Sequence, residues 1–134
     1  MPQEYNDLHQ SFGRCLKDRE FIGKFYNRLL DSDPAIPPMF EHTDFSRQRT
    51  LLRRGISMAI SCAEGNRLGV DAVTRMADMH SRKGSAPVPP EMHDNWLDCL
   101  LASISDSDPK DSPALQKRWH EAMDHSIDYF RRRY

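Results

Sequence analysis

Apolar side chains recur at helical spacing along nearly the whole chain, and no long segment alternates in the way a half-buried strand requires. The opening segment, residues 4–17, shows the pattern clearly. There Leu8, Phe12, Cys15 and Leu16 follow one another at i, i+4, i+7 and i+8, which places them on one side of a helix. A chain with only this period predicts an all-α fold.

Proline, glycine and aspartate residues divide this periodic pattern into separate helices. Pro34 ends one helix, Thr43 or Asp44 offers an N-cap for the next, and Gly84 is expected as a C-cap. Helices are therefore predicted over residues 4–17, 20–31, 44–64, 70–84, 90–104 and 113–132, with a short turn at 34–40 and a loop at Gly65, Asn66 and Gly69. The prediction is about six main helices plus one short turn in a single domain, residues 1–134. The irregular connections do not suit a simple four-helix bundle.

Composition narrows the classes of function. The chain has 134 residues and a net charge of −1, which gives no electrostatic reason to expect binding to nucleic acid or to a membrane surface. Its start is polar, and no apolar run approaches the roughly 20 residues that span a bilayer. Three cysteines without a CxxC spacing indicate a reduced, cytoplasmic protein.

Three of the predicted helices carry a polar residue on their apolar side. His80 falls with Val73 and Ala77, Tyr26 lies on the stripe of its own helix, and Gln48 lies among apolar neighbours. Each has an ordinary structural explanation, since a buried Tyr or Gln often bonds a neighbouring backbone and a lone His is more often a satisfied core residue than a ligand. Taken together, they predict a shared cavity with a histidine on one wall and hydrogen-bonding groups on another.

The run "FYNRLLDSDPAIPPMFEHTDFSRQRTLL" resembles the distal half of a bacterial globin, and the spacing of Phe40 and Gln48 is similar to that of the truncated globins. "MADMHSR" occupies the place of the proximal histidine helix, and "DNWLDCLLASI" resembles the helix that follows it. The resemblance covers about residues 20–104, with 112–132 suiting the final globin helix. The long first helix and the missing Gly-Gly loop motifs depart from the shortest truncated forms, so no subgroup is assigned.

The resemblance implies a globin-like fold that encloses a haem b pocket. It implies that His80 is the proximal iron ligand and that Phe40 stacks on the haem ring. Tyr26 and Gln48 would form the distal polar pair. The remaining implied positions are Leu52, one turn further along the distal helix, and Trp96, on the proximal side.

Two propionates of such a haem would need cations or water. Arg82 is one candidate, together with Arg47, Arg49 and Lys83, although a solvated cation is the ordinary explanation for each. His42 sits near the expected corner and would meet a propionate or the iron, but a surface histidine is the simpler interpretation.

The resemblance implies reversible binding of O2, NO or CO, for O2 binding, NO detoxification or gas sensing. Oxidation of NO to nitrate would need a separate reductase, since these 134 residues have no room for a flavin or nicotinamide domain. The alternative is a haem-free globin-fold regulatory or protein-interaction module. In either case a monomer or weak homodimer is expected.

Overall fold

The computed structural model describes residues 4–134; residues 1–3, which open the polar start of the chain, lie outside the described part. Within that part the chain forms six α-helices, one short 3-10 helix and no strand. In chain order they are α1 (Asn6–Leu16), α2 (Phe21–Ser32), η1 (Pro37–Phe40), α3 (Phe45–Ala63), α4 (Arg67–Met79), α5 (Pro90–Ser107) and α6 (Pro113–Arg133). The all-α prediction is confirmed.

Local sequence explains where several helices begin. Of the two candidate N-caps for α3, the structure uses Asp44, whose carboxylate accepts hydrogen bonds from two first-turn amides at 3.0 and 3.4 Å. Asn66 caps α4 in the same way. Pro90 and Pro113 stand at the first position of α5 and α6, where a missing N–H costs nothing. Between α3 and α4 the chain turns at Gly65, whose φ of 79° favours glycine.

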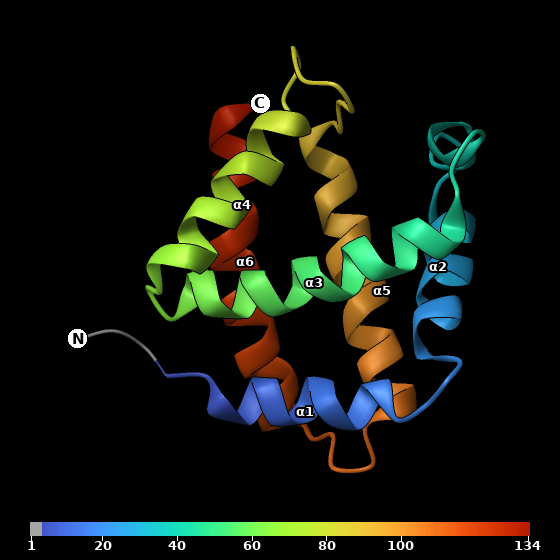
Figure 1. Cartoon of the computed structure of the whole chain (residues 1–134). Helices are drawn as coiled ribbons and strands as arrows, with labels where there is room; N and C mark the ends of the chain where they lie inside the picture. The colour runs from blue at the N-terminus through green and yellow to red at the C-terminus, as the bar shows by residue number, and fades with distance from the viewer. Residues whose placement is uncertain (1–3) are drawn as a thin grey trace.

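The helices pack in two groups that share α6. The first group is α3 with α4, and the second is α2 with α5, while α6 packs against α3, α4 and α5. Figure 1 shows α3 crossing in front of α5 and α6, with α4 and α5 standing apart above it and α1 crossing below. The arrangement leaves α4 and α2 on opposite sides of α5, and each of them forms one wall of the region described below.

The core lies where α1, α2, α3, α5 and α6 converge. Its largest fully buried side chains include Trp119, Phe21 and Phe25. The indole Nε1 of Trp119 donates a 3.0 Å hydrogen bond to the hydroxyl of Ser11, so its one polar atom is satisfied in the interior. Aromatic rings from α1, α2 and α6 therefore hold the lower half of the molecule together.

Two predicted boundaries around α4 were wrong. The helix begins before Gly69 rather than after it, because Asn66 caps it directly and Gly69 allows α3 and α4 to approach closely; a Cβ there would lie 2.5 Å from the backbone nitrogen of Cys62. The helix also ends at Met79, so His80 is its C-cap and Gly84 lies in the following loop. The predicted end of helix 90–104 was a few residues short of Ser107.

Within residues 4–134, none of the helices combines the length and the apolar character needed to cross a bilayer.

Candidate functional site

His80, the first residue of the candidate site considered, lies at the C-terminal end of α4. The Nδ1 atom of His80 lies 2.8 Å from the backbone carbonyl oxygen of Ala86. A carbonyl oxygen can only accept, so Nδ1 carries a proton, and in the neutral form of the ring the lone pair is on Nε2. This is the arrangement that fixes the tautomer and orientation of a histidine ligand in metal sites.

The loop after α4 is folded back so that it can supply this carbonyl. The amide of Ala86 donates to the carbonyl of Met79 at 3.0 Å, and the amide of Val88 donates to the carbonyl of His80 at 3.0 Å. Gly84 makes this path possible, because a Cβ there would lie 2.2 Å from the carbonyl oxygen of Met79. The backbone of the loop therefore holds the imidazole in place.

Two further rings from other helices lie beside His80. The ring of Phe130, on α6, stacks on the imidazole at a centroid distance of 5.9 Å. The same Phe130 ring contacts His93, on α5, at 5.1 Å. His93 is only 8% exposed, and burial, followed by the nearby His80 and Arg131, lowers its pKa to about 4. It is therefore a neutral imidazole at physiological pH.

An aromatic cluster forms the opposite wall, from α2, η1 and the start of α3. The ring of Tyr26 lies 6.0 Å from that of Phe40 and 5.5 Å from that of Phe45, and both pairs are edge-to-face. The rings of Phe40 and Phe45 stack on each other at 5.9 Å. Phe40 and Phe45 stay partly exposed, whereas Tyr26 is 4% exposed.

The phenol of Tyr26 is the polar group of this wall. Its hydroxyl donates a long, 3.4 Å hydrogen bond to the backbone carbonyl of Gln48. Burial raises the pKa of Tyr26 to about 12, although the side chain of Gln48 opposes the shift. The hydroxyl therefore remains a proton donor throughout the physiological range, and its present bond is weak enough to be exchanged for a better one.

The other predicted positions differ in their surroundings. Leu52 is buried on α3, and the side chain of Gln48, one turn earlier, is half-buried. Trp96 is half-buried on α5 and packs edge-to-face on Phe25 at 5.9 Å. Leu51, one of the apolar neighbours expected beside Gln48 on the buried side of α3, is 46% exposed, so the apolar stripe on this helix is narrower than predicted.

Arg82 lies in the loop after α4 and contacts the C-terminal residue. Its guanidinium lies over the ring of Tyr134, 5.0 Å from the centroid, in a cation–π contact at the surface. Arg47, Arg49 and Lys83 are also exposed. The exposed basic side chains therefore surround the region rather than line it.

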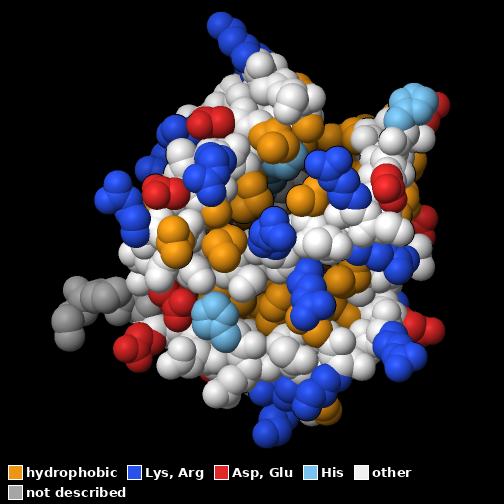
Figure 2. All heavy atoms as spheres, viewed as in Figure 1, with side chains coloured by type: hydrophobic (Ala, Val, Ile, Leu, Met, Phe, Trp, Pro, Cys, Tyr) orange, Lys and Arg blue, Asp and Glu red, His pale blue; other side chains and the backbone are white. Residues whose placement is uncertain are grey.

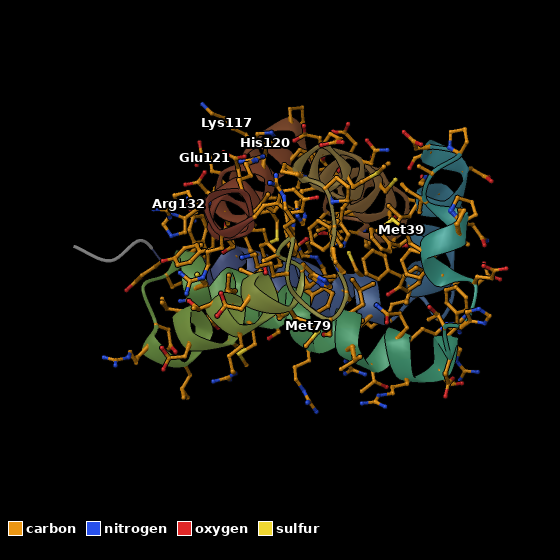
Figure 3. All side chains as sticks on the ribbon, turned by 90° about the horizontal axis from the view of Figure 1, so that it is seen from above. Met39, Met79, Lys117, His120, Glu121 and Arg132 are labelled. Atoms are coloured by element: carbon orange, nitrogen blue, oxygen red, sulfur yellow. The ribbon has the colours of Figure 1, made fainter. Side chains whose placement is uncertain are left out.

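Apolar side chains border an open space between the walls. Figure 2 shows a hollow on the face built by α3, α4 and α5, with a histidine ring beside it and hydrophobic and basic side chains around it. Seen from above, Met39 lies on the inner side of η1 and Met79 beside the end of α4 (Figure 3). Both side chains are partly exposed, Met39 at 40% and Met79 at 49%.

A separate groove of about 540 Å³ runs between α1 and α3. Phe12, Leu16, Arg53 and Arg54 are among the residues that line it. It contains none of the predicted site residues and lies outside the candidate site.

Comparisons with known proteins decide the family. No protein-family model matches the chain, and no curated protein matches it either. One solved structure does: a protein from Pseudomonas aeruginosa PAO1, described as structurally highly homologous to a human haemoglobin. It shares 31% sequence identity with this chain, covers 94% of each chain and superimposes with a TM-score of 0.89. This chain belongs to the globin family.

The predicted family and the predicted all-α, globin-like architecture are confirmed. The fold places the predicted site residues on the two walls described above. Tyr26, Phe40 and Gln48 meet on one wall, and His80 stands on the other, while Arg82 is exposed beside Tyr134. Their roles toward haem remain predictions.

Sequence reasoning missed three residues of this globin's candidate site: His93, Phe45 and Phe130. A signal for His93 was present, since it precedes Leu97, Leu100 and Ile104 at i+4, i+7 and i+11 and so lies on the buried side of its helix. This is the pattern that singled out His80. Phe130 carried no such signal, because only packing brings α6 beside the end of α4.

Proposed function

We propose that this globin binds haem b through the Nε2 atom of His80 and takes up a diatomic gas on the other face. The observation that supports it most is the hydrogen bond from His80 Nδ1 to the Ala86 carbonyl, which fixes the ring and selects the tautomer of the neutral imidazole whose Nε2 can bind a metal. The globin relative, described as highly homologous to a human haemoglobin, supports the same cofactor.

The residues present fit this group. Haem needs a neutral nitrogen ligand, flat apolar walls and a polar edge in contact with water. His80 offers the first, Phe40 and Leu52 offer apolar surface, and the exposed basic side chains offer partners for carboxylates. The uncovered Met39 and Met79 would then be shielded by the bound group.

When bound, haem iron held by one imidazole supplies a sixth coordination position that is open to O2, NO or CO. The chain's own contribution on that side is the hydroxyl of Tyr26, a donor kept protonated by burial. The half-buried Gln48 amide is the second donor of the same wall. Each hydrogen bond in such a low-dielectric site contributes about 1–2 kcal/mol, so two donors would slow the release of a polar ligand.

Slow release favours chemistry on the bound gas, or sensing, over bulk delivery. Oxidation of NO to nitrate is the enzymatic form of this proposal, and it would require an electron donor from a separate reductase. NO added to the oxygenated protein should then disappear with formation of nitrate. If the oxygenated protein leaves NO unchanged, its function is gas binding or sensing rather than NO dioxygenation.

Reconstitution with haemin tests the proposal directly. One equivalent should give a sharp Soret band, which shifts when CO is added to the dithionite-reduced protein. His80→Ala should weaken haem retention by about 10- to 100-fold, because it removes the ligand and its oriented hydrogen bond. His120→Ala is the matched control, since His120 lies on the outer face of α6 (Figure 3) and should retain haem as the native chain does.

The competing hypothesis is a haem-free globin-fold regulatory or interaction module. It predicts no Soret band at one equivalent of haemin, and that result would refute haem binding. Unchanged haem content and an unchanged spectrum in His80→Ala would refute His80 as the ligand while leaving haem binding intact.

A further inference from the structure

The proposed function uses one imidazole on the wall formed by α4, α5 and α6, yet this wall contains two. His93 projects from α5 with 8% of its surface exposed. It shares a helix face with the buried Leu97 and Leu100, where a polar ring has to find a partner or cost stability.

His93 has no such partner within the described residues 4–134. Its ring forms no hydrogen bond there, unlike the ring of His80, which is bonded to Ala86. No buried side-chain nitrogen or oxygen in that part of the chain is both sealed from solvent and unbonded. The nitrogens of His93 must therefore lie at the small exposed part of its surface, where they meet open space.

His80 is one of the groups near the ring of His93. The ring of Phe130 contacts both imidazoles, with its centroid 5.9 Å from that of His80 and 5.1 Å from that of His93. Both histidines therefore stand on the same wall of the candidate pocket, although they come from α4 and α5. The surrounding charges are Arg131 and Asp94, which pair with each other at 3.3 Å and leave the ring of His93 unpaired.

We propose that His93 is an alternative ligand of this site, able to bind haem iron in place of His80 when His80 is absent. The proposal rests on the haem binding proposed above. The step is the formation of one bond from an imidazole nitrogen lone pair to iron, with no change in proton or electron count. An imidazole that has no hydrogen-bond partner and lies beside His80 is a side chain suited to it.

Four variants test this assignment after reconstitution with haemin: His80→Ala, His93→Phe, the double variant, and His80→Ala with His120→Ala as the matched control. His93→Phe keeps an aromatic ring against Phe130 and removes only the nitrogens. Two readouts are independent of activity: the iron–histidine stretching band in the resonance Raman spectrum of the reduced protein, and the rate of haem transfer to an excess of apomyoglobin. Circular dichroism of each variant checks that it is folded.

We expect His80→Ala to keep an iron–histidine band and to lose haem at least about tenfold more slowly than the double variant. The double variant should show no such band, and His80→Ala/His120→Ala should behave as His80→Ala does. His80→Gln, whose amide can still donate to the carbonyl of Ala86, replaces His80→Ala if the alanine variant does not fold.

The inference is overturned if His80→Ala has no iron–histidine band and loses haem as fast as the double variant. It is equally overturned if the band persists in the double variant, because another histidine would then be the ligand. If the native chain takes up no haem, the proposed function fails together with the inference, and this result is distinct from the other two.

Discussion

At the scale of single residues, the site depends on which atom of each polar side chain is already engaged. Nδ1 of His80 donates to the backbone carbonyl of Ala86, so only Nε2 is available to a ligand. The hydroxyl of Tyr26 donates a 3.4 Å hydrogen bond to the backbone carbonyl of Gln48. The first bond is short and held by a folded loop, whereas the second is long and easily exchanged. Under the proposed function, the first group would serve as a fixed iron ligand, and the second would donate to an exchangeable gas ligand.

Replacing the phenol tests the second of these tasks. Tyr26→Phe keeps the ring in its aromatic cluster and removes only the hydroxyl donor. We expect O2 to dissociate about tenfold faster from the reconstituted variant, which corresponds to the loss of one hydrogen bond of about 1–2 kcal/mol. Stopped-flow displacement of O2 by CO measures the rate. An unchanged rate would remove Tyr26 from this role.

At the scale of elements, the loop between α4 and α5 matters as much as the helices it joins. It supplies the carbonyl of Ala86, and it turns closely over the end of α4 at Gly84. A side chain at position 84 would meet the backbone of Asp78 and Met79 at 2.4 and 2.2 Å. The loop can therefore hold His80 only because this position has no Cβ.

A methyl group at position 84 should displace His80 through the loop, without contacting the imidazole itself. Gly84→Ala should push the loop off α4, lengthen the bond between His80 and Ala86, and weaken haem retention by about tenfold. Gly13→Ala on α1 is the matched control, because a Cβ there has open space around it. That variant should retain haem normally and gain about 0.5–1 kcal/mol of stability. Equal haem loss from both variants would contradict this role of the loop.

Much of this element-scale description follows from the sequence. The spacing of apolar residues and the cap at Asp44 are local, so helix type and most boundaries could be predicted. The end of α4 could not, because Gly84 looks like a C-cap and acts instead through a contact with the preceding turn. The start of α4 was predicted wrongly for a similar reason, since Gly69 does not mark a loop but allows the close approach of α3 and α4.

At the scale of the whole molecule, a buried polar network joins segments that are distant in the sequence. The carboxylate of Asp108, in the loop before α6, accepts hydrogen bonds from Ser11 at 2.6 Å and from Arg14 at 2.6 and 2.9 Å. Ser11 in turn accepts from Trp119 on α6. Burial alone would raise the pKa of Asp108, but the bonds from Arg14 and Ser11 lower it to about 2.

This lowered pKa predicts how stability depends on pH. Because the folded state lowers the pKa of Asp108, its contribution is fully present above the pKa of an unfolded aspartate, about 4, and is lost as pH falls through about 2. Denaturation at a series of pH values should show native stability falling over this window, with Asp108 supplying about 2–3 kcal/mol.

Asp108→Asn should remove that contribution, lower stability at neutral pH by about 2–4 kcal/mol and flatten the acid limb of the profile. Asp106→Asn is its control, because the ion pair of Asp106 with Arg28 is exposed and should contribute at most about 1 kcal/mol. Profiles of the two variants that coincide would show that the network does not anchor the fold.

The sequence by itself determined the helices, the apolar faces and the polar residues that break them, because these depend on neighbours within a few turns. Tertiary structure decided what each polar residue meets. Only packing brings Phe130 and His93 beside His80, and only the loop path sets which nitrogen of His80 is free. Contacts between residues far apart in the chain have no local period, so the closeness of His93 to His80 became visible only once the helices were in place.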